Sequence, residues 1–258
     1  MATERREDAR ITPNPSSDRL ASTVGEWGAG TALSDVSFDD RVAANHLRLD
    51  AEAYENVYVV GDVHGCLPAL QDLWDRLDPS PREMVVFVGD LIRKGPTSTG
   101  VVDFVASRPN AVSVRGNNEM KVIEGTVDTV RFEPVREAIE STPLVVSWED
   151  SMAVHGGVDP RRALSAQAPI DLLETRAIPP ENGYDGPFWF KQYDGPGRVF
   201  FGHTVLESPF LSEHAVGLDT GCVYGGELTA YDCNRDEVVS VTPERTYQER
   251  ADEKILSF

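Results

Sequence analysis

The fold prediction starts from Val57-Tyr58-Val59-Val60-Gly61-Asp62-Val63-His64-Gly65. A run of four apolar or β-branched residues that stops at a glycine predicts a short inner strand of a sheet. Asp62 and His64 follow at a spacing of two, so on an extended backbone both side chains point the same way. An oxygen ligand and a nitrogen ligand at the carboxyl end of a buried strand suit a borderline divalent metal ion. A single Asp-x-His motif is common by chance, so it indicates a metal site only together with further ligand residues elsewhere in the chain.

The composition predicts a soluble globular protein. A chain of 258 residues, 40% of them hydrophobic, can form one large α/β domain with a tail or two small domains. No segment approaches the ~20 apolar residues of a membrane span, and the charged residues 1–8 lead into no apolar core of a secretory signal. Cys66, Cys222 and Cys233 are an odd set without CxxC spacing, which favours reduced thiols. We therefore expect a cytoplasmic protein.

The net charge of −19 limits the classes of partner. Lysine occurs only at positions 94, 121, 191 and 254, and strong acidity with scarce lysine is typical of halophilic proteins. At high salt the Debye length falls to ~3 Å and self-repulsion is screened. A broad nucleic-acid-binding surface is not expected, because it needs clustered positive charge.

The chain divides into an extension and a domain. Residues 1–50 contain few large apolar side chains, so we expect a flexible or loosely docked N-terminal extension with a short helix between 38 and 49. Residues 51–258 are expected to form the folded domain. Strand, helix, strand, helix and strand alternate between residues 57 and 114, which predicts a largely parallel sheet with ligands at its carboxyl edge.

The second half of the chain contains further strand patterns. A hairpin is predicted around Glu149-Asp150, with more strands near residues 198–201, 215–218, 227–232 and 237–241. The simplest arrangement is a second, mixed or antiparallel sheet stacked on the first.

Metal-ligand residue types follow or end five of these strands. They are Asp62, His64, Asp90, Asn117, His155 and His203. Each one alone is more often a turn residue or a structural residue, but the ordered set fits two divalent ions. Asp90 is expected to bridge them, since a carboxylate can neutralise two cations where one amide oxygen cannot. Two ions about 3.5–4 Å apart can share a hydroxide and orient it for in-line attack on phosphorus.

These ligand types lie in five blocks that resemble a known family. The blocks are Gly61-Asp62-Val63-His64-Gly65, Gly89-Asp90, Gly116-Asn117, His155-Gly156-Gly157 and Gly202-His203-Thr204. In this order they resemble the calcineurin-like metallophosphoesterases, and more narrowly the branch of serine/threonine protein phosphatases and symmetrical diadenosine tetraphosphatases. Residues 218–230 resemble the closing block of bacterial and archaeal members, and the whole resemblance covers about residues 56–232.

The resemblance implies both a fold and a cofactor. The fold is a four-layer α/β/β/α sandwich with two stacked mixed sheets. The cofactor is a pair of divalent ions, with manganese expected first and iron, zinc, nickel or cobalt as alternatives. Asp62 and His64 would hold one ion, Asn117, His155 and His203 the other, and Asp90 both.

Two residues depart from the family pattern. The second block of the protein phosphatases ends in Asp-Arg-Gly with a phosphate-binding arginine, whereas this chain has Arg93-Lys94-Gly95, so Lys94 takes the arginine's place. A lysine supplies charge but no bidentate fork. In the third block the family usually has a histidine that protonates the leaving group, and Asn118 stands there. An amide delivers no proton, and a general acid contributes ~10²–10⁴-fold.

The loss of the proton-donating histidine affects different substrates unequally. A serine alkoxide needs protonation to leave, whereas a nucleoside polyphosphate leaves as a weak base. We therefore favour a small-molecule nucleotide with a phosphoanhydride over a phosphoprotein, and both remain candidate substrates. Glu119 and Asp159 are weak candidates for a replacement acid.

An anionic substrate requires a local positive patch on so acidic a chain. Lys94, Arg93, Arg115 and Arg198 are the candidate phosphate-binding residues. Asp90, Asn118 and Arg115 are the residues expected to take part directly in the reaction. The aromatic residues 188–190 are expected to pack under a loop rather than to stack on a base.

The predicted function is a two-metal phosphoesterase that uses a metal-bridging hydroxide for direct attack on a phosphate ester or anhydride. The chain contains no Cys-x5-Arg loop and no Gly-x-Ser-x-Gly elbow that would supply a protein nucleophile. The alternative is a catalytically weak, metal-binding regulator that recognises phosphate.

Overall fold

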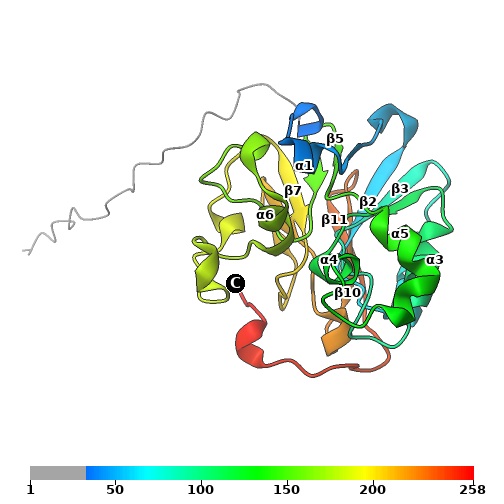
Figure 1. Cartoon of the computed structure of the whole chain (residues 1–258). Helices are drawn as coiled ribbons and strands as arrows, with labels where there is room; N and C mark the ends of the chain where they lie inside the picture. Colours follow the sequence, from blue (N-terminus) through cyan, green and yellow to red (C-terminus); the bar gives the residue numbers. More distant parts are fainter. Residues whose placement is uncertain (1–32) are drawn as a thin grey trace, which may run out of the picture.

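Two stacked sheets form the centre of the structure, a computed structural model in which residues 33–258 are described (Figure 1). The first sheet has five strands in the order β11-β10-β2-β3-β4. Their bounds are β2 Asn56–Val60, β3 Glu83–Phe87, β4 Ala111–Ser113, β10 Leu228–Asp232 and β11 Glu237–Val241. The three strands β2, β3 and β4 are parallel, as predicted, and β10 and β11 extend the sheet in antiparallel pairing.

The second sheet has six strands in the order β1-β5-β6-β7-β9-β8. Their bounds are β1 His46–Arg48, β5 Val145–Trp148, β6 Ser151–Ala153, β7 Arg198–Phe201, β8 Phe210–Leu211 and β9 Ala215–Gly217. The pairs β6–β7 and β7–β9 are parallel, whereas β5 and β6 form the predicted antiparallel hairpin. Both sheets are therefore mixed, and the predicted sandwich of two stacked mixed sheets is confirmed.

The alternation of side chains along β2 explains its uninterrupted apolar sequence. Val57 and Val59 face the core between the sheets, where they lie in one cluster with Phe200 of β7. Tyr58 and Val60 face the opposite side and belong to the core beneath the helices. Since side chains alternate between the two faces of a strand, a strand covered on both faces needs apolar residues at every position.

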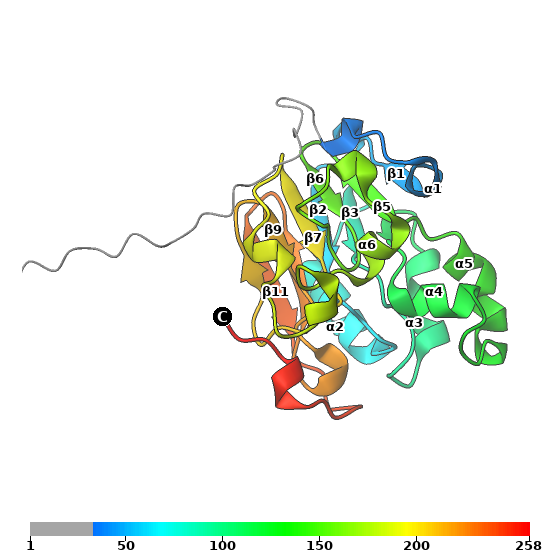
Figure 2. The same cartoon turned by 60° about the vertical axis from the view of Figure 1, so that its left-hand side comes forward.

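Helices cover the outer face of each sheet. On the first sheet lie α2 Leu67–Leu77, α3 Ser98–Ala106, α4 Asn117–Ile123 and α5 Arg136–Glu140, which Figure 2 shows beside one another. On the second sheet lie α1 Asp40–Ala43 and α6 Pro169–Glu174. In α2 the side chains of Leu70 and Leu73 are buried. Within residues 33–258 no helix combines the length and apolarity needed to cross a bilayer.

Part of the predicted N-terminal extension belongs to the folded structure. Residues 33–50 are described, and there β1 pairs in parallel with β5, while Leu33 and Val42 are completely buried in the core of the second sheet. A few well-placed apolar side chains dock a segment that is polar on average. The rest of the extension, residues 1–32, lies outside the described residues.

The chain returns from the second sheet to the first near its C-terminal end. β9 ends in the second sheet at Gly217, and β10 begins in the first sheet at Leu228. The connecting residues 218–227 therefore pass the edge where the metal-ligand types were predicted to gather.

Candidate metal centre

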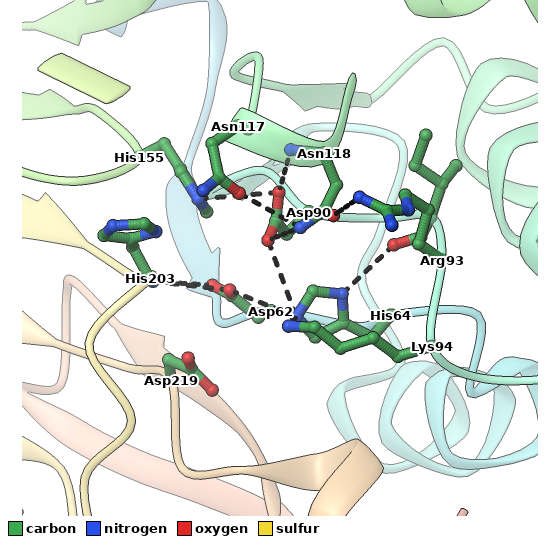
Figure 3. Close-up of polar contacts among 12 residues, drawn as sticks. Asp62, His64, Asp90, Arg93, Lys94, Asn117, Asn118, His155, His203 and Asp219 are labelled. Atoms are coloured by element: carbon green, nitrogen blue, oxygen red, sulfur yellow. Dashed lines mark hydrogen bonds and ion pairs between the residues drawn. The ribbon is translucent and has the colours of Figure 1, made fainter. Parts of the chain in front are cut away.

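The structure brings the six predicted metal ligands to one edge shared by the two sheets (Figure 3). Asp62 and His64 follow β2, Asp90 follows β3, and Asn117 begins α4 just after β4. His155 follows β6, and His203 follows β7. Because β2 with β3 and β6 with β7 are parallel pairs, their carboxyl ends lie together at the same edge.

Asp90 lies between two imidazoles. Its Oδ2 is 3.5 Å from Nε2 of His64, and its Oδ1 is 3.5 Å from Nε2 of His155. One ligand atom each from Asp62, Asp90 and His155 lies within 4.8 Å of the others, and all three residues are buried. One carboxylate that offers a different oxygen to each histidine suits the bridging role expected for Asp90.

The histidines fit metal ligation. His64 Nδ1 donates to the carbonyl of Ile92 at 3.1 Å and His155 Nδ1 to that of Val88 at 2.8 Å, which leaves Nε2 as the acceptor in both rings. Among the described residues, Nε2 of His155 and Nε2 of His203 are buried without a hydrogen-bond partner. Burial lowers the pKa of His155 and His203, and lowers that of His64 to about 3. The neutral imidazoles of His155 and His203, each with an unpaired buried Nε2, match what a divalent ion requires.

A further buried carboxylate, Asp219, joins this centre from the loop between the sheets (Figure 3). Burial, followed by repulsion from Asp219 and Asp90, raises the pKa of Asp62 well above its usual value. A cation relieves such repulsion, and the ammonium of Lys94 already contacts Nε2 of His64. Asp219 was not among the predicted ligands, although it too lies just after a buried strand, β9, and two residues before a glycine, Gly221.

Several residues of the centre have left-handed backbone conformations. His64, Asp90, Arg93, Lys94 and His203 account for five of the eight non-glycine residues with positive φ in the described part of the chain. Such conformations cost of order 1–3 kcal/mol each and persist where the surroundings enforce them. Their concentration here indicates that the packing fixes these side chains in place.

The glycines next to the ligands allow close approach. A Cβ on Gly202 would lie 1.9 Å from Oδ1 of Asp62, and one on Gly116 would lie 2.2 Å from Oδ1 of Asp90. Neither position leaves room for a side chain. The recurring pattern of a glycine before a polar residue therefore reflects the packing of two ligand loops against each other.

Glu119 positions the Asp90 loop. Its carboxylate accepts hydrogen bonds from the backbone N–H groups of Asp90 at 2.9 Å, Gly116 at 2.8 Å and Ile92 at 3.2 Å. Burial and then the charge of Asp90 raise the pKa of Glu119 to about 8. Asp159, the other candidate acid, is paired with Arg161 at 2.7 Å. Neither acid lines the cleft at the metal centre.

Asn118 makes contacts through its backbone and both atoms of its amide. Its backbone N–H donates to Asp90 Oδ1 at 2.9 Å, and its Nδ2 donates to Asp90 Oδ2 and to Asn117 Oδ1. Its Oδ1 accepts from Arg93 Nη1 at 2.7 Å. Asn118 therefore orients the carboxylate of Asp90 and the amide of Asn117, a positioning role that needs no proton transfer.

The metal centre opens into a cleft of about 310 Å³ whose rim is basic. The cationic residues that line it are Arg93, Lys94, Lys121, Arg176 and Arg250. Arg93 and Lys94 were predicted, whereas the other three were missed: Lys121 lies within α4, and Arg176 and Arg250 lie in irregular segments. Arg176 donates to the backbone carbonyl of His203 at 3.3 Å, and its Nε is buried without a partner among the described residues.

The structure does not bring Arg115 and Arg198 to this cleft. Arg115 donates to the backbone carbonyls of Glu140 and Thr142, at 3.0 and 2.7 Å, and so supports the end of α5. Arg198 begins β7 and pairs with Asp236 at 2.8 Å, at the opposite end of the strand from His203. Five residues of extended chain span about 16 Å, so the expectation that Arg198 binds phosphate is corrected. The expectation for Arg115 is corrected as well, because its side chain turns toward α5.

The aromatic residues 188–190 pack inside the molecule, as expected. Trp189 and Phe190 are buried in the core of the second sheet, and Phe188 packs against that core. They leave no stacking surface at the metal centre.

Comparisons with known proteins agree with this geometry. Residues 55–238 match the sequence profile of a family described as calcineurin-like phosphoesterase. The chain is 30% identical over 243 residues to the asymmetrical bis(5'-nucleosyl)-tetraphosphatase PrpE of Halalkalibacterium halodurans, a match that covers 78% of this chain and 98% of that protein. The protein of the same name from Anoxybacillus flavithermus is 30% identical, with 73% and 95% covered. These names contain the word asymmetrical, whereas the sequence blocks suggested the symmetrical enzymes.

Solved structures support the same fold. A crystal structure described as a proposed diadenosine tetraphosphatase has a TM-score of 0.69 and 28% identity, and the match covers 77% of this chain and 97% of the other. A protein serine/threonine phosphatase from Saccharomyces cerevisiae has a TM-score of 0.53 at 18% identity, with 80% and 84% covered. The second likeness concerns the fold alone.

Proposed function

This chain belongs to the calcineurin-like phosphoesterase family, and we propose that it is a two-metal hydrolase that cleaves a phosphoanhydride bond of a dinucleoside polyphosphate. The observation that carries this proposal is the charge of the cleft. Five cationic side chains line it in a chain that has a net charge of −19 and only 24 lysines and arginines in total. So many cations around a metal centre suit several adjacent phosphates better than a single phosphoryl group.

The residues at the centre have distinct roles in this proposal. Asp62, His64, Asp90, Asn117, His155 and His203 would hold two divalent ions, with manganese the first to test. The ions, when bound, supply Lewis acidity at the phosphoryl oxygens and a nucleophile at neutral pH. Lys94 and Arg176 bind phosphate oxygens, and Asn118 and Glu119 hold Asp90 in place.

The substrate preference follows from the contacts of Asn118. Its amide oxygen accepts from Arg93 and its amide nitrogen donates to Asp90, so the residue delivers no proton to a leaving group. A nucleotide that leaves from an anhydride carries its negative charge on phosphate and needs no such proton. The names of the relatives, which act on bis(5'-nucleosyl) tetraphosphates, support the same preference.

The test is hydrolysis with identified products. We expect the manganese-loaded protein to hydrolyse p-nitrophenyl phosphate and diadenosine tetraphosphate, and to lose both activities on chelation. A product mixture of nucleoside triphosphate and monophosphate would indicate asymmetrical cleavage, and two diphosphates symmetrical cleavage. Faster turnover of phosphopeptides than of the dinucleotide would reject the nucleotide and favour a phosphoprotein substrate.

A second candidate function is a phosphate-recognising regulator. It is favoured by Asn118, which stands where the family usually has a proton donor. In that case the protein would bind metal and phosphate but would not turn over any of the three substrates.

The expectations drawn from composition are part of the proposal. A cytoplasmic, halophilic protein with a net charge of −19 should have its highest activity and stability in molar potassium chloride. A decline in thermal stability on adding salt would reject the halophilic assignment.

A further inference from the structure

A second pocket of about 360 Å³ lies next to the metal cleft. Its apolar lining comes from Val205, Leu206, Tyr224 and Ile255. The segment around Leu256 closes one side, because its N–H donates to the carbonyl of Val205 at 2.9 Å and its carbonyl accepts from Glu207 N–H at 2.8 Å. No step of the proposed hydrolysis uses this pocket.

The pocket adjoins the cleft. Val205 lines both cavities. Tyr224 lies at the boundary, because its hydroxyl accepts a 3.0 Å hydrogen bond from Arg250 and its ring centre is 5.3 Å from Nζ of Lys94. Arg250 and Lys94 both line the cleft. A ligand whose phosphates are bound by Lys94 and Arg250 could therefore place its neighbouring end in the pocket.

The two cavities differ in charge. Five cations line the cleft, whereas the residues that line the pocket include no cation and two carboxylates, Glu207 and Asp252. Phosphate is repelled from such a pocket. A neutral ring system with N–H and O–H donors fits, since its flat faces pack on apolar side chains and its donors pair with the carboxylates.

We propose that this pocket binds a nucleoside of the substrate while the polyphosphate lies in the cleft. This inference rests on the proposed function and names the part of the substrate that gives specificity. The volume lies at the lower end of the about 300–1,000 Å³ typical of small-molecule sites, which suits one nucleoside. The ring of Tyr224 offers a face to the base, and Glu207 and Asp252 accept hydrogen bonds from the base or the ribose.

The test compares a pocket-filling variant with a matched control. Ile255→Trp fills the pocket, and Ile170→Trp makes the same change on α6, where the side chain is 58% exposed. Asp252→Ala, at an exposed position, removes one carboxylate without filling the pocket. Circular dichroism melts verify that each variant folds.

Binding is measured with adenosine itself by saturation-transfer NMR. We expect a signal with the wild-type protein and with Ile170→Trp, its loss in Ile255→Trp, and a weaker signal in Asp252→Ala. If Ile255→Trp fails to fold, Asp252→Ala decides. The absence of a signal from the wild-type protein, or undiminished signals in the folded pocket variants, overturns the inference.

Hydrolysis supplies the second readout and separates the two proposals. In Ile255→Trp the ratio of kcat/KM for diadenosine tetraphosphate to that for p-nitrophenyl phosphate should fall by about tenfold or more. An unchanged ratio would contradict the nucleoside pocket. A wild-type protein that hydrolyses neither compound would refute the proposed function, and adenosine binding would still decide whether the pocket accepts a nucleoside.

Discussion

Arg93 donates a 2.7 Å hydrogen bond to the amide oxygen of Asn118, so the two blocks that depart from the family pattern contact each other. This contact turns the amide nitrogen of Asn118 toward Asp90. A histidine at position 118 would meet the positive charge of Arg93, which disfavours the protonated imidazole that a general acid requires. A test of the proton donor therefore has to substitute Arg93 and Asn118 together.

The first prediction concerns the proton donor. In the wild-type protein, log kcat for aryl phosphates should fall steeply as the leaving-group pKa rises. The double variant Arg93→Asp with Asn118→His should flatten this dependence and raise kcat for poor leaving groups by about 10²-fold or more. Asn118→His alone should gain much less, and equal gains in the single and double variants would contradict the role given to Arg93.

The second prediction concerns the bridging carboxylate. Asp90→Asn keeps the shape of the side chain but removes the charge shared by both sites. Metal affinity should fall by more than about 100-fold, because one neutral amide oxygen cannot serve two cations and a change at a direct ligand should exceed the effect of changing an outer hydrogen-bond partner. Mass spectrometric metal analysis checks this, with Asp159→Asn as the control because Asp159 is a buried carboxylate that does not line the metal cleft. Full metal content in Asp90→Asn would refute the bridge.

The third prediction concerns Arg176 in the cleft. A hydrogen bond to a charged group contributes about 1.5–3 kcal/mol, so Arg176→Gln should lower kcat/KM for diadenosine tetraphosphate by about 10- to 150-fold. The matched control is Arg235→Gln, since the side chain of Arg235 is 74% exposed and pairs with Asp232. Similar values of kcat/KM in the two variants would show that Arg176 does not bind the substrate.

The fourth prediction concerns Arg115, which the structure places outside the cleft. Arg115→Gln removes hydrogen bonds to two backbone carbonyls near α5 and should lower the free energy of unfolding by about 1–3 kcal/mol. Chemical denaturation measures this, with Arg82→Gln as a surface control at a side chain that is 67% exposed. Unchanged stability together with a large loss of kcat would indicate that Arg115 takes part in the reaction.

The sequence was sufficient to predict what depends on local patterns. An apolar run followed by a glycine and a ligand type identified the positions of Asp62, Asp90 and His203, because parallel strands bring their carboxyl ends to one edge. Helical spacing likewise accounts for the buried face of α2, where Leu70 and Leu73 lie three residues apart and pack in the core of the first sheet.

The sequence was insufficient where long-range packing decides. The three-residue strand β1 has no clear alternation and forms only because β5 pairs with it. Arg176 and Arg250 lie in irregular segments, so nothing local indicates that they line the cleft. Arg115 directly precedes a ligand block, yet its side chain turns to α5, a direction that proximity in sequence does not specify.

The predicted metal ligands come from both sheets. Asp62 and Asp90 leave the first sheet, whereas His155 and His203 leave the second. An ion held by both groups would cross-link the two halves of the sandwich, and binding to the folded state alone raises its stability in proportion to the logarithm of the free metal concentration. The melting temperature would then report metal occupancy, and metal-depleted protein would be the form most easily digested by proteases.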